Sequence, residues 1–450
     1  MADISTSGVV TGRLDARQYV ENFSDLHPPL SPNKARIEAD RCYFCFDAPC
    51  MDACPTSIDI PLFIRQIDTG NPDGAAETIF NSNILGGMCA RVCPTETLCE
   101  EVCVHVEQGN LPVKIGELQR YATDHAMQSG AVSFKRAKET GRRVAIVGAG
   151  PAGLACAHCL AATGHSVVIF EANSKPGGLN EYGLAAYKTV NNFAQTEVEF
   201  ILSIGGIEIE YGKKLGTDIE LGRLSKEFDA VFLGLGLGAT NSLGIAGDDL
   251  DGVQDAVDYI AQLRQASDLS NLPVGREVVV IGGGMTAIDI AVQIKRLGAR
   301  DVTMVYRRGP EQMGASDFEC ELALNNGVTI THWAAPTRVI GDDGRVTAVD
   351  FERTNLQNGK LEGTGETFRL AADQVFTAIG QVLAPSPFAD SNLKLEGRRI
   401  AVDKDQKTSL ANVWAGGDCV VGGKNLTVSS VEDGKVAAVA INDFLAGKGE

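Results

Sequence analysis

The chain has 450 residues, of which 44% are hydrophobic, and it carries a formal net charge of −18 at pH 7. That length predicts two to four domains, each large enough to bury a core. The negative charge argues against nucleic acid or an anionic membrane as a partner, and no run of about 18 apolar residues is present that could span a membrane. The N-terminus lacks the pattern of a signal peptide, which predicts a cytoplasmic protein with reduced cysteines.

Residues 1–135 are predicted to form a helical, loop-rich domain that holds most of the cysteines. Eight of the twelve cysteines fall into two groups, which are Cys42, Cys45, Cys50 and Cys54, followed by Pro55, and Cys89, Cys93, Cys99 and Cys103. Runs of this kind that end in Cys-Pro are typical of iron–sulfur ligands. Structural zinc stays open as an alternative, although zinc sites usually show paired CxxC motifs and only Cys42/Cys45 has that form. A disulfide framework is the third alternative.

A charged stretch at 129–143 is predicted to be a linker, and a nucleotide-binding motif follows it. Gly148-x-Gly150-x-x-Gly153 comes directly after an apolar strand. These glycines permit a tight turn, a close approach of diphosphate to the backbone, and close packing of the next helix on the strand. The second strand ends in Glu171, 18 residues after the third glycine, where a carboxylate can accept hydrogen bonds from ribose hydroxyls. We expect a dinucleotide here, with Gly178 also in contact with it.

The motif repeats 134 residues later as Gly282-x-Gly284-x-x-Ala287. The strand after this second motif ends in Arg307 and Arg308 instead of an acid. Two guanidinium groups attract a 2′-phosphate that a carboxylate would repel, so the second site is predicted to favour NADPH over NADH. Thr286, in the first turn of the following helix, is predicted to contact the same nucleotide. The alternative is that both arginines are solvated or paired with acids.

The segment after Gly380 has no glycine fingerprint of its own and is predicted to return to the first nucleotide-binding unit. Asp418 would then lie near the ribityl chain of a flavin, and a helix that begins near Thr427 would point its positive N-terminus at the isoalloxazine ring. The first site therefore suits FAD, and the second suits NAD(P)H.

The predicted fold class is α/β, with a helical N-terminal iron–sulfur domain followed by two Rossmann-like nucleotide-binding domains. The NAD(P)H domain is predicted to be inserted in the FAD domain, which is thereby divided into two segments. The predicted boundaries are 1–135 for the helical 4Fe-4S domain, 140–270 for the first segment of the FAD-binding domain, 271–378 for the NAD(P)H-binding domain and 379–450 for the second segment of the FAD-binding domain.

Taken together, these motifs resemble a known family. They are the run from Cys42 to Pro55, the segment from Leu85 to Pro94, the two glycine motifs, and the tail from Ala415 to Lys435. The chain is similar over nearly its whole length to the flavin and iron–sulfur half that dihydropyrimidine dehydrogenase shares with the small subunit of NADPH-dependent glutamate synthase. The tail and the segment Ile115–Arg120 are most similar to the dihydropyrimidine dehydrogenase branch.

The resemblance implies two 4Fe-4S clusters with crossed ligation. The implied ligands are Cys42, Cys45, Cys50 and Cys103 for one cluster, and Cys54, Cys93, Cys99 and Gln119 for the other. Cys89 is then a small buried residue without a ligand role. The chain departs from the family at Met285, where relatives commonly carry an acid, and this departure bears on contact with the nicotinamide nucleotide.

The resemblance also implies the direction of electron flow. NAD(P)H would pass a hydride to FAD, and the clusters would then carry single electrons outward, with no acid or base residue needed for the hydride step. The chain contains no FMN-binding barrel, so we expect a separate FMN-bearing subunit that reduces uracil or thymine, in a dimer of heterodimers. The alternatives are the glutamate synthase small subunit, a free-standing NAD(P)H:ferredoxin-type reductase, and a non-catalytic cluster scaffold.

Overall fold

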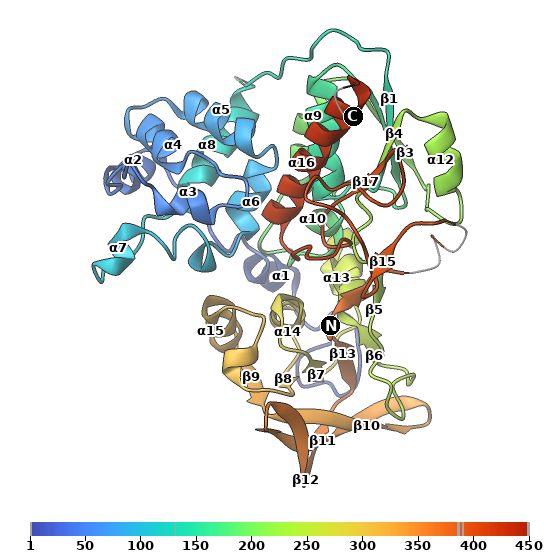
Figure 1. Ribbon diagram of the computed structural model, residues 1–450. Coiled ribbons are helices and arrows are strands. Elements are labelled where there is room, and N and C mark those ends of the chain that lie inside the picture. The colour runs from blue at the N-terminus through green and yellow to red at the C-terminus, as the bar shows by residue number, and fades with distance from the viewer. Residues whose placement is uncertain (1, 131, 385–387, 389–390, 448–450) are drawn as a thin grey trace. The chain divides into compact units, whose positions relative to one another are not determined.

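The computed structural model describes residues 2–130, 132–384, 388 and 391–447 (Figure 1). Contacts divide the chain into two compact units. Unit 1 comprises Met1–Leu26, Tyr182–Val190 and Thr240–Gln381, and unit 2 comprises His27–Glu181, Asn191–Ala239 and Val382–Glu450. This division leaves the predicted domain boundaries as predictions.

Unit 2 begins with a helical bundle. Its helices are α2 (Pro32–Asp40), α3 (Pro49–Ala53), α4 (Ile60–Asp68), α5 (Pro72–Ser82), α6 (Gly86–Val92), η1 (Thr95–Thr97), α7 (Val104–Glu107) and α8 (Ile115–Ser129). Local sequence explains several of the starts, because Ser31, Asp59 and Asn71 each accept an N–H bond as the N-cap of a helix whose first turn holds a proline. In α4 the buried side chains recur at helical spacing and form one apolar face.

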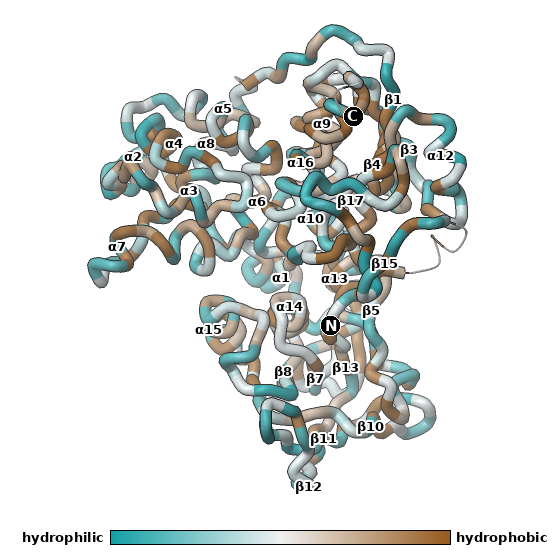
Figure 2. Tube along the Cα trace, viewed as in Figure 1, coloured by the Kyte–Doolittle hydropathy of each residue, from teal (hydrophilic) through white to brown (hydrophobic). Residues whose placement is uncertain are grey.

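The rest of unit 2 is a parallel sheet with strand order β17-β4-β1-β2-β3. Its strands are β1 (Arg143–Val147), β2 (Ser166–Glu171), β3 (Ile207–Tyr211), β4 (Ala230–Leu233) and β17 (Val413–Ala415). Its helices are α9 (Pro151–Ala162), α10 (Leu179–Tyr182), α11 (Phe193–Leu202), α12 (Leu221–Glu227) and α16 (Thr427–Leu445), and two short strands are β15 (Leu395–Glu396) and β16 (Arg399–Ile400). Helix α9 consists mostly of apolar residues, as its colour in Figure 2 shows. It is almost wholly buried because it packs against both the sheet and α16.

Unit 1 contains a second parallel sheet, with strand order β6-β13-β7-β8-β9. Its strands are β6 (Val253–Asp255), β7 (Glu277–Ile281), β8 (Asp301–Tyr306), β9 (Val328–His332) and β13 (Gln374–Thr377). Its helices are α1 (Ala16–Asn22), α13 (Ala256–Gln265), η2 (Leu269–Asn271), α14 (Met285–Arg296), η3 (Pro310–Gln312) and α15 (Asp317–Asn325). An antiparallel sheet follows, made of β10 (Ala334–Asp342), β11 (Arg345–Gln357) and β12 (Lys360–Ala371).

The chain connectivity shows how one unit is placed within the sequence of the other. Strands β4 and β17 are hydrogen-bonded neighbours in the sheet of unit 2. The main segment of unit 1 lies between them in sequence, and the two connections contain the short strands β5 (Ala239–Thr240) and β14 (Gln381–Val382). The second nucleotide-binding fold is therefore an insertion in the first. In the described part of the chain, no helix combines the length and the apolar character needed to cross a membrane.

Candidate functional site

The first glycine turn connects β1 to α9 and has no room for side chains at two of its glycines. Gly148 has a φ of +99°, and a Cβ atom there would lie 2.3 Å from the carbonyl oxygen of Gly234. A Cβ atom at Gly153 would lie 2.0 Å from the carbonyl oxygen of Gly148. Gly150 is the N-cap of α9, and a Cβ atom there would have no neighbour closer than 3.9 Å. The turn is closed toward the protein and open at Gly150, as a diphosphate requires.

Glu171 ends β2 beside this turn and is buried. Its carboxylate accepts the backbone N–H of Ala149 at 2.8 Å and the backbone N–H of Asn173 at 2.7 Å. A carboxylate has about four acceptor positions, so these bonds leave capacity for a ribose hydroxyl. Gly178 lies on the same turn with a φ of +56°, and a Cβ atom there would be 2.8 Å from Cα of Gly150. The structure therefore brings Glu171 and Gly178 to the glycine turn.

The C-terminal segment adds two more of the predicted residues to unit 2. Asp418 follows β17, and burial raises the pKa of its carboxyl group despite the nearby Arg399 guanidinium. Thr427 starts α16 and donates from its hydroxyl to Oδ1 of Asn180 at 2.7 Å. Helix α16 packs directly on α9, since a Cβ atom at Gly434 would lie 2.3 Å from the carbonyl oxygen of Ala152. The close packing holds the two helices of the first nucleotide site together.

The second glycine turn, in unit 1, connects β7 to α14 and repeats this design with one exchange. A Cβ atom at Gly282 would lie 2.4 Å from the carbonyl oxygen of Ala378, and Gly284 has no atom within 4 Å of such a position. Thr286 is the second residue of α14 and is half-buried. Ala287 occupies the third motif position and is fully buried. The open backbone at Gly284 and the first turn of α14 fit a diphosphate.

Arg307 and Arg308 follow directly after β8. Their backbone carbonyls accept bonds from Thr354 and from Trp333, which fixes the backbone of this corner. Arg307 is exposed and Arg308 is half-buried. Over the ranges that the structure describes, neither guanidinium group forms an ion pair, so both keep their donors for an anion.

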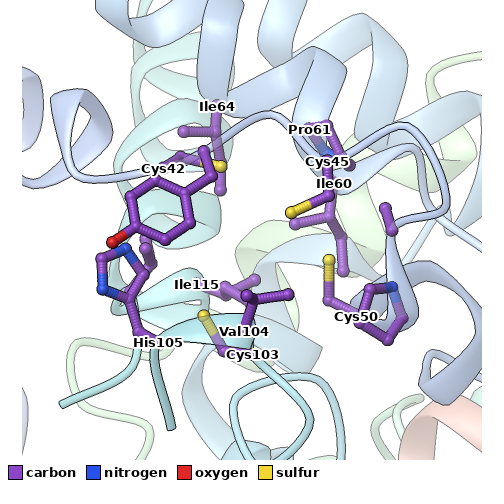
Figure 3. A pocket seen from close by; sticks show the side chains of 14 residues that line it. Cys42, Cys45, Cys50, Ile60, Pro61, Ile64, Cys103, Val104, His105 and Ile115 are labelled. Carbon is purple, nitrogen blue, oxygen red and sulfur yellow. The ribbon is translucent and has the colours of Figure 1, made fainter. Parts of the chain in front are cut away.

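Four cysteine sulfurs gather in one pocket of the helical bundle. Figure 3 shows Cys42, Cys45, Cys50 and Cys103 pointing into this space. The apolar wall of the pocket is formed by Ile60, Pro61, Ile64, Val104, Val113 and Ile115. Burial raises the pKa of the Cys42 thiol and raises that of Cys50 to about 12, so a bound cation is needed to hold them as thiolates. Four thiols in an apolar pocket fit an iron–sulfur cluster.

The other predicted ligands lie around α6 and α8. The pKa of Cys93 is raised by a hydrogen bond with Cys89, by burial, and by the nearby Cys99 and Cys54. Burial also raises the pKa of Cys99, with further contributions from Glu100 and Cys54. Cys54, Cys93 and Cys99 are thus close neighbours, and Cys89 lies beside them.

Gln119 is buried on α8 and donates from Nε2 to the carbonyl oxygen of Gly86 at 2.7 Å. This bond holds it against α6, the helix that Cys93 follows directly. Within the described ranges, no three His, Cys, Asp or Glu side chains come close enough to hold a single metal ion. A four-iron cluster holds its ligands farther apart, because iron and sulfide fill the space between them.

One residue in this region was missed by the sequence analysis. Glu197, on α11, is 1% exposed and accepts the backbone N–H of Met88 at 2.8 Å, at the start of α6. Burial raises its pKa to about 8, although the N–H donors of α6 and the Arg91 guanidinium act in the opposite direction. The signal was present in the sequence, since Glu197 stands four residues after Phe193 and four before Ile201, on the apolar face of the helix.

Two family models match the chain. Residues 19–131 match the model described as dihydropyrimidine dehydrogenase domain II, 4Fe-4S cluster. Residues 142–437 match the model described as pyridine nucleotide-disulphide oxidoreductase.

Relatives match over almost the whole chain. The NAD-dependent dihydropyrimidine dehydrogenase subunit PreT of Escherichia coli O157:H7 is 36% identical over 429 residues, which cover 95% of this chain and 98% of the relative. The glutamate synthase (NADPH) small chain of Escherichia coli K12 is 32% identical over 446 residues, which cover 94% of each chain.

Among solved structures, FprA of Mycobacterium tuberculosis in complex with NADPH matches with a TM-score of 0.57 and 20% identity, over 68% of this chain and 86% of that chain. At this identity the match concerns the fold alone. Together with the family models it confirms the predicted fold class, a helical iron–sulfur domain followed by two Rossmann-like folds.

Proposed function

Because the chain belongs to the family of flavin and iron–sulfur oxidoreductase subunits that contains the dihydropyrimidine dehydrogenase subunit PreT, we propose that it is the electron-input subunit of a two-subunit dihydropyrimidine dehydrogenase. The chain is an NAD(P)H-dependent oxidoreductase of the FAD and iron–sulfur type. In the proposed reaction, electrons pass from NAD(P)H through FAD and two 4Fe-4S clusters to an FMN-bearing partner subunit that reduces uracil or thymine.

The observation that carries this proposal is the pocket of Cys42, Cys45, Cys50 and Cys103 in the same compact unit as the first glycine turn. A nucleotide site alone would serve many reductases. A sulfur-lined pocket in the same unit as a flavin-type site serves electron transfer, because a flavin accepts two electrons and a cluster moves them singly.

We assign the predicted ligands to cofactors as follows. FAD would be held by the first glycine turn with Glu171, Gly178, Asp418 and Thr427. NAD(P)H would be held by the second turn with Thr286 and the two arginines. One cluster would take the four cysteines of the pocket, and the other would take Cys54, Cys93, Cys99 and Gln119.

We also propose that the nucleotide is NADPH. The unpaired guanidinium groups at the end of β8 support this, since they can bind a 2′-phosphate by charge-assisted hydrogen bonds. The name of the PreT relative points the other way, because it describes an NAD-dependent enzyme. Arg307 and Arg308 are features of this chain itself, and they support NADPH.

For the assembly, we propose a dimer of heterodimers in the cytoplasm. A reducing compartment suits a chain with so many cysteines, and none of the twelve forms a disulfide. The partner is expected to carry FMN and the pyrimidine site.

The proposal is tested by anaerobic purification with iron, acid-labile sulfide and flavin analysis. We expect FAD, about eight iron atoms per chain, as two four-iron clusters require, and bleaching of the flavin by NADPH. Uracil reduction should require the FMN-bearing chain. A colourless protein with stoichiometric zinc and no sulfide would refute the proposal, as would uracil reduction by this chain alone at the rate of the complex.

A second function is favoured by a specific observation, the near-complete match to the glutamate synthase small chain. The two functions share the same chemistry in this chain and differ in the partner. Assays of the reconstituted complex with uracil, and separately with glutamine plus 2-oxoglutarate, distinguish them. A free-standing NAD(P)H:ferredoxin-type reductase would instead reduce ferredoxin without either partner.

A further inference from the structure

The surface around the four-cysteine pocket is unusually apolar. The segments 42–50, 60–64 and 103–115 line the pocket, and they form a small part of the described chain. Of these segments, 42–50 and 103–115 nevertheless carry four of the sixteen exposed large apolar side chains of the described residues, which are Tyr43, Phe46, Val106 and Leu111. Phe46 is fully exposed and Leu111 is 80% exposed. We call these four side chains the apolar patch. Such a cluster of exposed apolar groups marks an interaction surface.

Contacts within the bundle join the segments that carry the patch. Tyr43 stacks on His105 with ring centroids 4.2 Å apart, and its hydroxyl donates to Gln108 at 3.0 Å. Arg41 donates to the carbonyl oxygen of Leu111 at 2.6 Å. These contacts fix the loop around Leu111 beside the Cys42 loop, so the two sides of the pocket opening form one surface.

The rim of the patch is acidic. Exposed carboxylates on the same part of the bundle are Asp40, Asp47, Asp52, Glu101 and Glu107. Of the exposed cations there, Lys114 pairs with Glu117 at 2.9 Å and the Arg65 guanidinium lies 4.5 Å from the centre of the Phe44 ring. Lys34 and Arg36 on α2 are exposed as well, so carboxylates outnumber cations by five to four. A partner with an apolar contact face and a basic rim would be complementary.

The patch also lies at the outer end of the bundle. Helix α6, which precedes Cys93, contacts α11 and α16 of the flavin-type fold. In Figure 1, α3 and α7, which flank the four-cysteine pocket, lie farther from α16 than α6 does. The second cysteine set is therefore nearer to the first nucleotide site, and the four-cysteine pocket is nearer to the exposed patch.

We propose that the apolar patch and its acidic rim are the docking surface for the electron-accepting FMN-bearing subunit, which would present an apolar face with a basic rim. This inference rests on the proposed function and locates the surface through which electrons leave the subunit. Each NAD(P)H supplies two electrons, which leave through this surface one at a time, with release of one proton. Burying the patch would bring the acceptor close to the four-cysteine pocket, and the short distance favours electron transfer.

The first test measures binding, with the holoprotein and the FMN-bearing chain of a bacterial dihydropyrimidine dehydrogenase in a calorimeter. We expect the double substitution Phe46→Ser/Leu111→Ser to raise the dissociation constant at least about tenfold, since exposed anchors of this kind dominate interface affinity. Leu111→Ser alone, eight residues from the nearest cysteine, should account for part of the loss. The matched control is Leu324→Ser/Val439→Ser, two side chains that are 54% and 63% exposed elsewhere. Equal affinity in patch and control variants would overturn the proposal.

The second test does not depend on the identity of the partner. Cytochrome c is a small basic protein with an exposed haem edge and accepts one electron, so two molecules are reduced per NAD(P)H. We expect Asp47→Lys/Glu107→Lys to lower the rate of its reduction about tenfold at low ionic strength, and to weaken the salt dependence of that rate. Ferricyanide reduction, iron content and flavin content should stay at wild-type levels.

The two tests separate failure of the proposal from failure of the proposed function. If the FMN-bearing chain does not bind the wild-type protein, the proposed partner is wrong, and the cytochrome c experiment still judges the surface. If charge reversal leaves cytochrome c reduction unchanged, electrons leave elsewhere and the docking surface is wrong.

Discussion

The two nucleotide-binding turns share one backbone design but place their indispensable glycines differently. In the first turn the third motif position must be glycine, because Gly153 sits against the carbonyl oxygen of Gly148, while Ala149 fits in the middle of the turn. In the second turn the third position is Ala287, and it is the middle residue, Gly283, that has no room. The glycine motif alone therefore does not show at which position each turn has no room for a side chain.

The register of the strands explains the exchange. The residue before each turn pairs with Phe170 in unit 2 and with Val305 in unit 1, so Glu171 and Tyr306 occupy equivalent positions. Glu171 accepts the N–H of Ala149, whereas the Tyr306 ring covers Gly283, where a Cβ atom would lie 2.4 Å from the ring. At the position where unit 2 has the carboxylate of Glu171, unit 1 has the ring of Tyr306, and Arg307 and Arg308 follow that ring directly.

The units also differ in how they stabilise buried acids. In unit 1, Asp289 and Glu319 share Lys188, whose Nζ lies 2.7 Å from an oxygen of each. Burial alone would lower the pKa of Lys188, but these two carboxylates outweigh it and the pKa is raised. In unit 2, Glu197 has backbone N–H donors and no such cation in hydrogen-bond contact among its described partners. The charges of Asp289 and Glu319 are balanced by the ammonium group of Lys188, whereas Glu197 stays uncharged by retaining its proton.

The largest effect is expected for Glu197, in the pH dependence of the folding stability of unit 2. The pKa of Glu197 is raised from 4.5 to about 8. Between these values the unfolded chain releases the proton while the folded protein keeps it, so stability falls as pH rises. The loss approaches about 5 kcal/mol at about 1.36 kcal/mol per pH unit and is complete above pH 8. Glu197→Gln should remove the decline, because its oxygen still accepts the N–H of Met88.

The measurement is hydrogen-exchange protection of α6 and α11 peptides between pH 5 and pH 9, in wild type and in Glu197→Gln. Protection should coincide at the acidic end and diverge at the basic end, with the variant more stable. Parallel pH curves would show that Glu197 ionises normally in the folded protein.

The counterpart in unit 1 is Lys188→Met. Removing the cation leaves two buried carboxylates without their partner, which costs about 3–5 kcal/mol. The loss should appear as reduced exchange protection of α14. The triple variant Lys188→Met/Asp289→Asn/Glu319→Gln should recover most of it, since it removes all three charges. If the single variant were as stable as wild type, charge pairing would not be what stabilises this acid pair.

Because the two turns require glycine at different positions, we expect a glycine substitution in each turn to weaken binding of the nucleotide at that turn only. Gly153→Ala should cost about 3 kcal/mol and lower FAD content, because the new Cβ meets a backbone oxygen that cannot move aside. Gly283→Ala should weaken NAD(P)H binding in the same way. The matched controls are Ala287→Gly and Ala149→Gly, with losses of about 1 kcal/mol or less. Flavin content, nucleotide affinity and melting temperature are measured for all four variants. Equal losses for Gly153→Ala and Ala287→Gly would show that the two turns do not differ in the position that requires glycine.

The sequence predicted the family and the fold class, and both are confirmed by the comparisons. Glycine spacing and strand–turn–helix order carry that information, since backbone geometry dictates them. Glu171 and Tyr306 occupy equivalent positions in the two units. This equivalence could not be predicted from the motif, because it depends on strand register. The position of Glu197 on the apolar face of α11 could be read from the sequence, but its partner could not, because that partner is a backbone N–H more than 100 residues away. The ligand assignments stay predictions from the resemblance, and so do the domain boundaries.

The smallest effect is expected at the corner after β8, where the two units differ in charge. Arg307→Glu/Arg308→Glu should raise KM for NADPH about 100-fold, since two charge-assisted bonds to a 2′-phosphate are lost and repulsion replaces them. KM for NADH should change little, because that nucleotide has no phosphate there. Arg338→Glu/Arg345→Glu, on the antiparallel sheet of the same unit, makes the same change in net charge and is the control. An equal rise in both KM values would mean that the arginines hold the loop and do not select the nucleotide. A rise for NADPH alone would show that the arginines recognise the 2′-phosphate, a group that the Glu171 carboxylate at the end of β2 would repel.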